Sequence, residues 1–279
     1  MQLGRQSDNV EDRRGMRAGL GGGVGRISGL GLGGVLVLLA LGWLLTGDPM
    51  GLLGGGGVPV DSSAPSSSGP PTDPGGVFAS QVLADTEDTW TELFKQSGQR
   101  YQPPKLVLFS GAVDSACGTN SSAVGPFYCP GDQRVYIDLT FYHELDQRFG
   151  APGDFAQAYV LAHEVGHHVQ NLTGVFENAR RSASRADANA LSVAQELQAD
   201  CYAGVWGFYA AKRGVLQSGD AEEGLRAAAA IGDDRIQRRT QGQVTPETWT
   251  HGSSEQRVRW LRTGMESGKP SACDTLSGR

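Results

Sequence analysis

The sequence is poor in histidine and cysteine, with five and four of these residues in a chain of 279. It contains no Cys-x-x-Cys pair, which argues against a zinc ribbon. It also lacks an excess of basic residues, since 24 Lys and Arg stand against 30 Asp and Glu, for a net charge of −6. Without a basic excess, the chain gives no indication of a nucleic-acid partner.

A long apolar run occurs only once, over residues 27–47, and it carries no charge. As a helix it would cover roughly 30 Å, the thickness of a hydrocarbon core, which predicts a transmembrane helix. Arginines precede it, and no Lys or Arg follows before Lys95. The positive-inside rule then predicts a cytoplasmic tail over residues 1–26 and the rest of the chain outside. A cleaved signal peptide is the alternative, but no A-x-A-like cleavage site follows Leu45.

Gly, Pro and Ser dominate residues 48–76. Such a composition cannot bury enough apolar surface to fold, so we expect a linker here and the folded domain over residues 77–279. All four cysteines lie in this domain, and an even count on the far side of a membrane indicates disulfides. Four cysteines allow three connectivities, of which proximity favours Cys117 with Cys129 and Cys201 with Cys273.

Hydrophobic periodicity predicts an α+β domain, with a few strands early and helices late. A β-rich stretch predicts a strand over residues 105–111, and alternating apolar residues predict another over 134–142. Asp154 and Gln157 resemble a capping box that opens a helix over residues 155–170. Further helices are expected over residues 78–94, 191–212, 221–231, 234–240 and 254–263.

Three of the five histidines lie within residues 163–168. On a helix, His163 and His167 are one turn apart on the same face, so both imidazoles can reach one ion about 2 Å away. Glu164 is rotated by about 100° from His163 and can touch a metal-bound water without ligating the metal. This is the His-Glu-x-x-His spacing of zinc hydrolases. The alternative is a solvated polar face of an ordinary helix.

A catalytic zinc ion usually needs a third protein ligand and one open position. Glu196 and Asp200 are four residues apart on the next long predicted helix and so share a face. Glu196 can complete a His-His-Glu set, and Asp200 can accept a hydrogen bond from the back nitrogen of a liganding histidine. Apolar residues on the same helix argue against an exposed acidic stripe.

Two residues near the C-terminus are further candidates. His251 can donate to the oxyanion that forms when water attacks a peptide carbonyl, and Arg257 is a candidate support for the site. The alternative is that His251 precedes and caps a helix while Arg257 forms a surface salt bridge. The remaining histidines are expected to be structural or solvated: His168 is rotated away from the metal face, and His143 has no second histidine at the required spacing.

Five motifs together resemble the bacterial neutral zinc metallopeptidase family of YpfJ-like proteins, a gluzincin type. They are SDNVEDRRG, CGTNSSAVGPFYCPGDQRVYIDLTFY, AHEVGHHVQNLTG, ELQADCYAGVW and HGSSEQRVRWLRTG. The resemblance implies a membrane-tethered, zincin-like metallopeptidase domain, with a small sheet and its edge strand over the HExxH helix and a mostly helical C-terminal half. The spacing from His251 to Arg257 also resembles membrane gluzincins of the HtpX and CAAX-processing type. In these the histidine lies near the oxyanion and the arginine braces the metal helix, but Gly252 replaces their usual proline.

We therefore expect a zinc metallopeptidase in a bacterial cell membrane, single-pass, with a cytoplasmic N-terminus and an extracytoplasmic catalytic domain. One zinc ion would be held by His163, His167 and Glu196, and Glu164 would take a proton from the attacking water. The substrate, a peptide or protein, would add as an extended strand along residues 135–141.

Two alternatives remain at this point. The chain could be a non-catalytic binding or scaffold module with a structural zinc ion, provided that His251 fills the fourth coordination position. It could also hydrolyse another bond, such as a peptidoglycan cross-link.

Overall fold

The structure, a computed structural model, describes residues 1–15, 70–182 and 188–276. All the described residues belong to one compact unit. The predicted transmembrane helix 27–47 and most of the predicted linker 48–76 lie outside the described residues. Within the described ranges, no helix is both long and apolar enough to span a bilayer.

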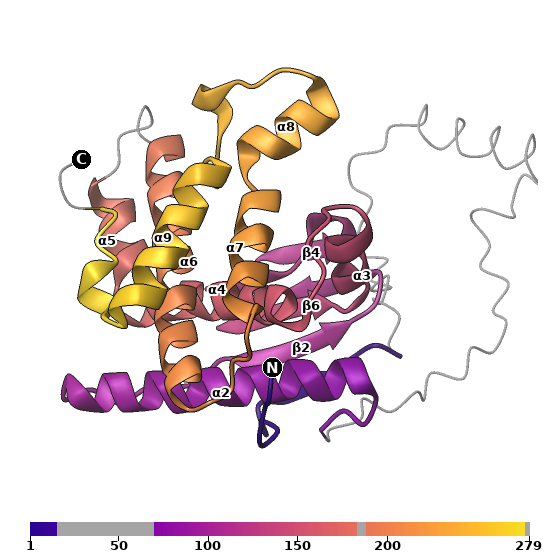
Figure 1. The fold of residues 1–279 in the computed structure, drawn as a ribbon, viewed down its shortest axis with the longest axis vertical. Helices are drawn as coiled ribbons and strands as arrows, with labels where there is room; N and C mark the ends of the chain where they lie inside the picture. The colour runs from indigo at the N-terminus through magenta and orange to yellow at the C-terminus, as the bar shows by residue number, and fades with distance from the viewer. Residues whose placement is uncertain (16–69, 183–187, 277–279) are drawn as a thin grey trace, which may run out of the picture. The chain divides into compact units, whose positions relative to one another are not determined.

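A four-stranded sheet runs through the domain (Figure 1). Its order is β1 (Val10–Asp12), β2 (Lys105–Phe109), β6 (Arg134–Asp138) and β5 (Phe127–Cys129). β1 and β6 run parallel to β2, whereas β5 runs antiparallel to β6. The expectation that substrate adds along residues 135–141 is therefore wrong, because β5 already pairs with β6 and takes the edge position.

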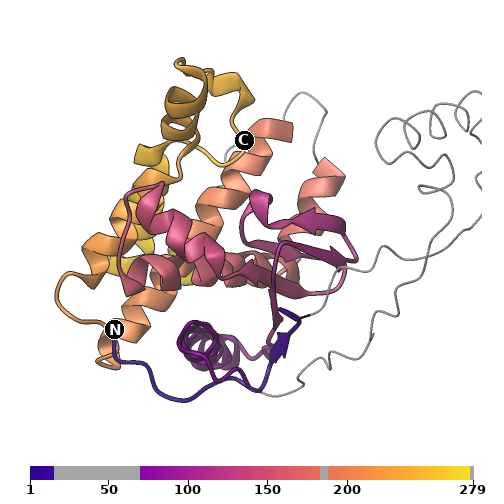
Figure 2. The ribbon, with the colours of Figure 1, turned by 90° about the vertical axis from the view of Figure 1, so that its right-hand side faces the viewer.

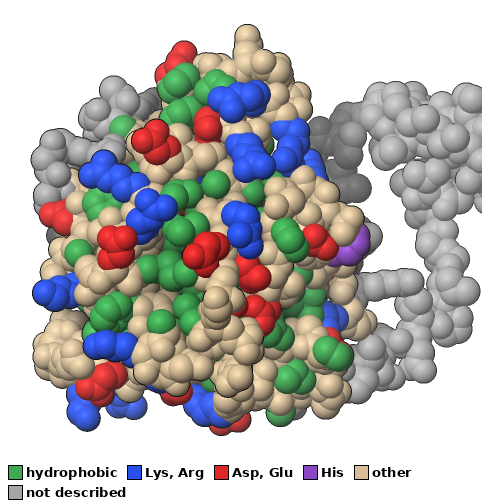
Figure 3. Space-filling model, in the orientation of Figure 1, with side chains coloured by type: hydrophobic (Ala, Val, Ile, Leu, Met, Phe, Trp, Pro, Cys, Tyr) green, Lys and Arg blue, Asp and Glu red, His purple; other side chains and the backbone are tan. Residues whose placement is uncertain are grey.

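Both faces of this sheet are covered. Leu106, Leu108, Val135 and Ile137 point into the main core, together with residues of helices α2 (Pro74–Gln96) and α4 (Asp154–Leu172). The alternate side chains of the strands join a smaller cluster on the other face, beside a hairpin of β3 (Ala112–Ser115) and β4 (Gly118–Ser121). On the surface shown in Figure 3, acidic and basic side chains are interspersed.

The first residues of the chain belong to this sheet. Val10–Asp12 pairs in register with Leu106–Leu108. Figure 2 looks along α2 and shows the indigo strand β1 beside that helix. We expected a separate tail over residues 1–26 and a domain that begins at residue 77. Instead, residues 1–15 are part of the domain, and α2 begins at Pro74, inside the expected linker.

Helices make up most of the remaining domain, as the α+β prediction required. The helix that carries the HExxH motif is α4, and the next long helix is α6 (Ala188–Lys212). The others are α3 (Thr140–Gln147), α5 (Val175–Ser182), α7 (Asp220–Ala230), α8 (Asp233–Gln241) and α9 (Ser254–Ser267). Figure 1 shows α6, α7 and α9 standing together beyond α4.

Two predictions about the ends of elements are wrong. The strand expected to reach residue 142 ends at Asp138, whose carboxylate accepts bonds from the backbone and hydroxyl of Thr140 at 3.0 and 2.8 Å and so opens α3. The capping box of Asp154 does not form, because Gly153 is the N-cap of α4, and the Phe155 N–H of the first turn donates to Glu223 at 3.2 Å. The Asp154 carboxylate instead binds the α-amino group of Met1 at 2.5 Å.

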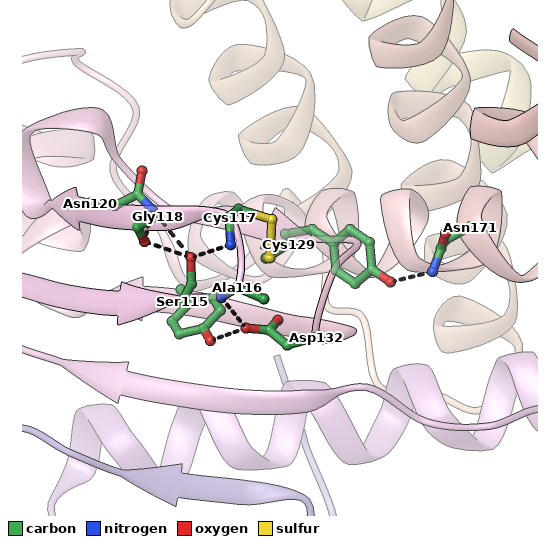
Figure 4. The surroundings of a disulfide bond; sticks show 10 residues. Ser115, Ala116, Cys117, Gly118, Asn120, Cys129, Asp132 and Asn171 are labelled. Atoms are coloured by element: carbon green, nitrogen blue, oxygen red, sulfur yellow. Dashed lines mark hydrogen bonds between the residues drawn. A yellow bond between two sulfur atoms is a disulfide. The ribbon is translucent and has the colours of Figure 1, made fainter. Parts of the chain in front are cut away.

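The structure contains the disulfide pairs that proximity favoured, Cys117–Cys129 and Cys201–Cys273. The first joins the β3–β4 hairpin to β5 (Figure 4). At the same junction, Asp132 accepts bonds from the Ala116 backbone at 3.0 Å and the Tyr136 hydroxyl at 2.7 Å. The edge strand β5 is thus fixed on one side by a covalent bond and on the other by its ladder with β6.

Glycines allow α6 and α9 to touch along their backbones. A Cβ at Gly204 would lie 2.1 Å from the Leu261 carbonyl oxygen, and one at Gly264 would lie 2.0 Å from the Cys201 carbonyl oxygen. Neither backbone oxygen can move without shifting its helix. This close packing holds α9 against the helix that carries Glu196.

We expect Gly204→Ala to lower the free energy of unfolding by at least about 1–3 kcal/mol, because the added methyl forces the two helices apart. The matched control is Gly207→Ala, one turn further along α6, where the new Cβ would lie an ordinary 3.4 Å from the Phe155 ring. This control should be neutral or should gain up to about 1 kcal/mol from helix propensity. Urea denaturation measures both, and equal stabilities would contradict the proposed backbone contact.

Candidate metal centre

Two helices bring the three predicted ligands together. His163 and His167 project from α4, and Glu196 projects from α6. The carboxylate oxygens of Glu196 lie 3.1 Å from His163 Nε2 and 3.4 Å from His167 Nε2. These three residues form a group whose ligand atoms all lie within 4.8 Å of one another.

The donor set fits zinc. Ligand atoms that bind a tetrahedral ion at 2.0–2.2 Å lie about 3.3–3.6 Å from each other, close to the separations found here. Two imidazole nitrogens and one carboxylate oxygen are the ligands of one common class of catalytic zinc site. The ligands are also held on two helices rather than on loops, which restricts their positions before any ion binds.

A glycine within the HExxH motif sets the spacing of the two helices. A Cβ at Gly166 would lie 2.9 Å from the Ala199 carbonyl oxygen on α6. A larger residue would push α6 away and carry Glu196 out of reach of the histidines. The HExxH motif allows any residue at this position, so the motif does not predict a role for Gly166. The role depends on a contact between distant parts of the chain.

Hydrogen bonds at the back nitrogens orient both imidazoles. His163 Nδ1 lies 2.8 Å from Asp200 Oδ1, and His167 Nδ1 lies 2.9 Å from Gln170 Oε1. The amide of Gln170 donates to the Gln195 carbonyl at 2.7 Å, so its oxygen faces the histidine. Each ring therefore carries its proton on Nδ1 and presents Nε2 to the ion. Asp200 was predicted for this role, whereas Gln170 was missed.

Asp200 is fully buried and has two further partners. Arg257 donates to both of its oxygens, from Nε at 2.8 Å and from Nη2 at 2.9 Å, and the Tyr159 hydroxyl donates at 2.6 Å. Burial alone would raise the pKa of Asp200, but the charges of Arg257 and His163 outweigh it and hold the pKa at about 2. Arg257 is thus a buried partner of the histidine support, not a surface residue.

The ligands open into a cavity of about 500 Å³, which Glu164 also lines. Glu164 follows His163 on α4 and is 8% exposed. It lies outside the group of three ligands. A carboxylate in this position can take a proton from a molecule in the cavity while the three ligands hold the ion.

His251 lines the same cavity from the loop before α9 and is half exposed. Its Nδ1 lies 3.2 Å from Asp233 Oδ1. The other oxygen of Asp233 accepts backbone N–H bonds from Thr250, His251 and Gly252 at 2.8, 2.7 and 3.0 Å. Asp233, which the sequence did not single out, therefore fixes both the loop and the imidazole. His251 does not cap α9, because Ser253 does so in a capping box with Gln256.

Gly252 has a φ of +94° and donates its N–H to Asp233. A proline could do neither, since its φ is fixed near −65° and it has no N–H. The loop before α9 therefore has a conformation that proline at position 252 could not adopt, and Asp233 holds that conformation by its hydrogen bonds.

The other histidines lie apart from the ligands. His168 Nε2 bonds to the Gln102 carbonyl at 2.6 Å, and its Nδ1 lies 3.0 Å from the Tyr128 hydroxyl. Burial lowers the pKa of His168 to about 4, so it is neutral and structural, as its position predicted. His143 is exposed on α3.

Comparison with known proteins shows the family to which the chain belongs. A sequence model described as "Putative neutral zinc metallopeptidase" matches residues 1–276. The chain is 49% identical to the uncharacterized protein YpfJ of Escherichia coli K12, over 98% of this chain and 96% of that protein. It is 50% identical to the uncharacterized protein Rv2575 of Mycobacterium tuberculosis H37Rv, over 63% of this chain and 64% of that protein. No solved structure matches.

The match of the family model over almost the whole chain, together with the near full-length likeness to YpfJ, decides the classification. The chain belongs to the "Putative neutral zinc metallopeptidase" family of YpfJ-like proteins.

Proposed function

We propose that this protein hydrolyses peptide bonds, using one zinc ion held by His163, His167 and Glu196. The observation that carries the proposal is Glu164, which lies beside the three ligands in an open cavity and is not one of them. A closed structural zinc site has four protein ligands and no use for such a carboxylate. An open position with a neighbouring base is the arrangement of a hydrolase.

When bound, zinc would lower the pKa of a water molecule toward neutrality and polarise a peptide carbonyl. Glu164 accepts the proton of the attacking water and then delivers it to the leaving amine. Asp200 and Gln170 keep the two imidazoles in the tautomer that presents Nε2. In this scheme Glu164 transfers the proton, while Asp200 and Gln170 only position the ligands.

His251 is the candidate donor to the developing oxyanion. It lines the cavity, and its contact with Asp233 at Nδ1 leaves Nε2 as the nitrogen available to a substrate. Donors that are already oriented before reaction stabilise the charge without reorganisation. Asp233 supplies that orientation and is a positioning residue in this scheme.

The substrate would lie along β5 in place of the interior strand first expected. Within the described chain, β5 is the edge strand beside α4, and Tyr128 on it lines the cavity. The Cys117–Cys129 disulfide holds this strand, and the Asn171 amide on α4 donates to the Tyr128 hydroxyl at 3.0 Å (Figure 4). An extended peptide could add to its outer edge by backbone hydrogen bonds.

The alternative of a non-catalytic module requires a fourth protein ligand. Among the described residues, no further His, Cys, Asp or Glu joins the group of three, His251 included. A zinc stoichiometry of one with no cleavage of any peptide would favour the module, and cleavage of a peptidoglycan cross-link alone would redefine the substrate.

Glu164→Gln should lower kcat by about 10²–10⁴-fold, because the amide cannot accept the proton of water. Zinc content should stay at one per chain, since Glu164 is not a ligand. Casein or peptide cleavage together with metal analysis measures both quantities. Glu92→Gln on the exposed face of α2 is the matched control. A Glu164→Gln protein that cleaves at the wild-type rate would exclude Glu164 as the base.

Zinc binding should release protons and weaken as the pH falls. Burial alone would lower the pKa of His163, but Asp200 and Glu196 outweigh it and raise the pKa to about 10; Glu196 likewise raises the pKa of His167. The raised pKa values favour the protonated form of both rings without metal, and zinc must displace these protons. Calorimetric titration with zinc in buffers of different ionisation enthalpy counts them, and an affinity that is constant between pH 6 and 8 would contradict this expectation.

A further inference from the structure

The cavity has an apolar end that the hydrolytic chemistry does not use. Val124, Phe141 and Phe149 line it together with the zinc ligands. They come from three places in the chain: a 3₁₀ turn (Ser122–Val124), the start of α3, and the segment that follows α3. The rings of Phe141 and Phe149 lie 6.3 Å apart, and both are only partly buried.

The side chain of Val124 is mostly exposed to solvent. Its exposed fraction is 63%, and among the described residues it is the one large hydrophobic side chain that is classed as exposed. The turn that carries it is built on Gly125, whose φ is +80° and whose Cβ position lies 3.4 Å from the Phe141 ring. The fold therefore holds Val124 beside Phe141 at a cavity wall while leaving its side chain in solvent. Exposed apolar surface of this kind contributes favourable free energy only when another apolar group covers it.

Two arginines fix the position of Phe149. The guanidinium groups of Arg148 and Arg239 lie 5.6 and 5.8 Å from its ring centroid. Arg239 also donates to the Arg148 carbonyl, which links α8 to the segment after α3. The ring is thus held by cation–π contacts and presents a defined apolar surface to the cavity.

We propose that Val124, Phe141 and Phe149 form the specificity subsite of the enzyme, which takes a large apolar side chain near the scissile bond. The inference rests on the proposed peptidase function. It is supported by the continuity of this surface with the zinc ligands in one cavity. A small or acidic side chain would leave the three apolar residues wet, whereas leucine, methionine or phenylalanine would cover them.

Cleavage of a proteome-derived peptide library by the zinc-loaded protein tests the preference directly. The expected result is enrichment of large apolar residues at one position next to the cut. Two matched peptides that differ by Leu or Ala at that position then give a ratio of kcat/KM values. This ratio does not depend on the folded fraction of a preparation, so partial unfolding of a variant cannot imitate the effect.

Val124→Asp and Phe149→Ala should each lower the Leu-to-Ala ratio by about tenfold or more. Phe208→Ala is the aromatic control, because Phe208 lies on α6 outside the cavity lining and should leave the ratio unchanged. Peptide cleavage without an apolar preference, or with an unchanged ratio in both variants, would overturn the subsite and leave the peptidase intact. No cleavage of any peptide by the zinc-loaded protein would overturn the peptidase and the subsite together.

A second, independent observation concerns the segment 7–14, before the apolar run. Ser7 is buried and donates its hydroxyl to Glu87 at 2.6 Å, and the Asn9 amide donates to the same carboxylate at 2.8 Å. Glu87 on α2 is only 6% exposed, and the Arg5 guanidinium also donates to it at 3.1 Å, so residues 5–9 supply hydrogen-bond donors to this buried carboxylate. With the pairing of β1 and β2, these contacts make the segment an integral part of the catalytic domain.

The two sides of the apolar run are therefore tied together. Arg14, before the run, and Asp73, after it, form an ion pair at 2.5 Å. A single crossing by residues 27–47 would separate these residues by roughly 30 Å of hydrocarbon and would remove β1 from the sheet. We infer that the segment 7–14 lies on the same side of the membrane as the metal centre. This differs from the cytoplasmic placement that the positive-inside rule predicts for residues 1–26.

Cysteine labelling in bacteria that express the full chain tests this inference. Asp8→Cys reports on the N-terminal segment and Glu92→Cys on the catalytic domain, since both positions are exposed. A membrane-impermeant maleimide should label both in intact spheroplasts or label both only after permeabilisation. Gln6→Cys, also exposed, repeats the measurement with a second N-terminal position. Opposite accessibility of the two regions would overturn the inference.

Discussion

The candidate metal centre depends on one buried carboxylate. Asp200 contacts the back nitrogen of His163 on α4, and its ion pair with Arg257 joins α6 to α9. Burying two opposite charges is tolerated only when their hydrogen bonds are satisfied, and both oxygens of Asp200 have partners at 2.6–2.9 Å. The loop with His251 leads directly into α9. Asp200 therefore connects this loop, through Arg257 on α9, to the ligand His163 on α4. A change that moves Asp200 would therefore alter both the orientation of the His163 ring and the position of the loop that carries His251.

Small residues make this arrangement possible. Gly166 brings α4 against α6, and Gly204 with Gly264 brings α6 against α9. Each contact is backbone on backbone, so the helix spacing is set by main-chain geometry and not by adaptable side chains. The hydrogen bonds and ion pair of Asp200 require fixed distances between α4, α6 and α9, and the glycine contacts set those distances.

The sequence predicted those parts of the site that follow from helical spacing. The pairs His163 with His167 and Glu196 with Asp200 each lie one turn apart, so local periodicity places them on common faces. Gln170, Asp233 and Gly166 were missed because their roles come from contacts between distant segments. The same reason explains the fold: the long helices and both main strands were predictable, whereas the place of β1, the edge position of β5 and the N-cap of α4 depend on tertiary partners.

Strand β1 also constrains the order in which the molecule can assemble. Val10 pairs with Leu106, so the partner strand of β1 is synthesised almost a hundred residues after it. Closing so long a loop is entropically unfavourable. The cost is offset only once β2, β6 and α4 have formed a core against which β1 can pair and pack. Residues 10–12 are thus expected to reach their native position late, although they precede every other strand of the sheet in the sequence.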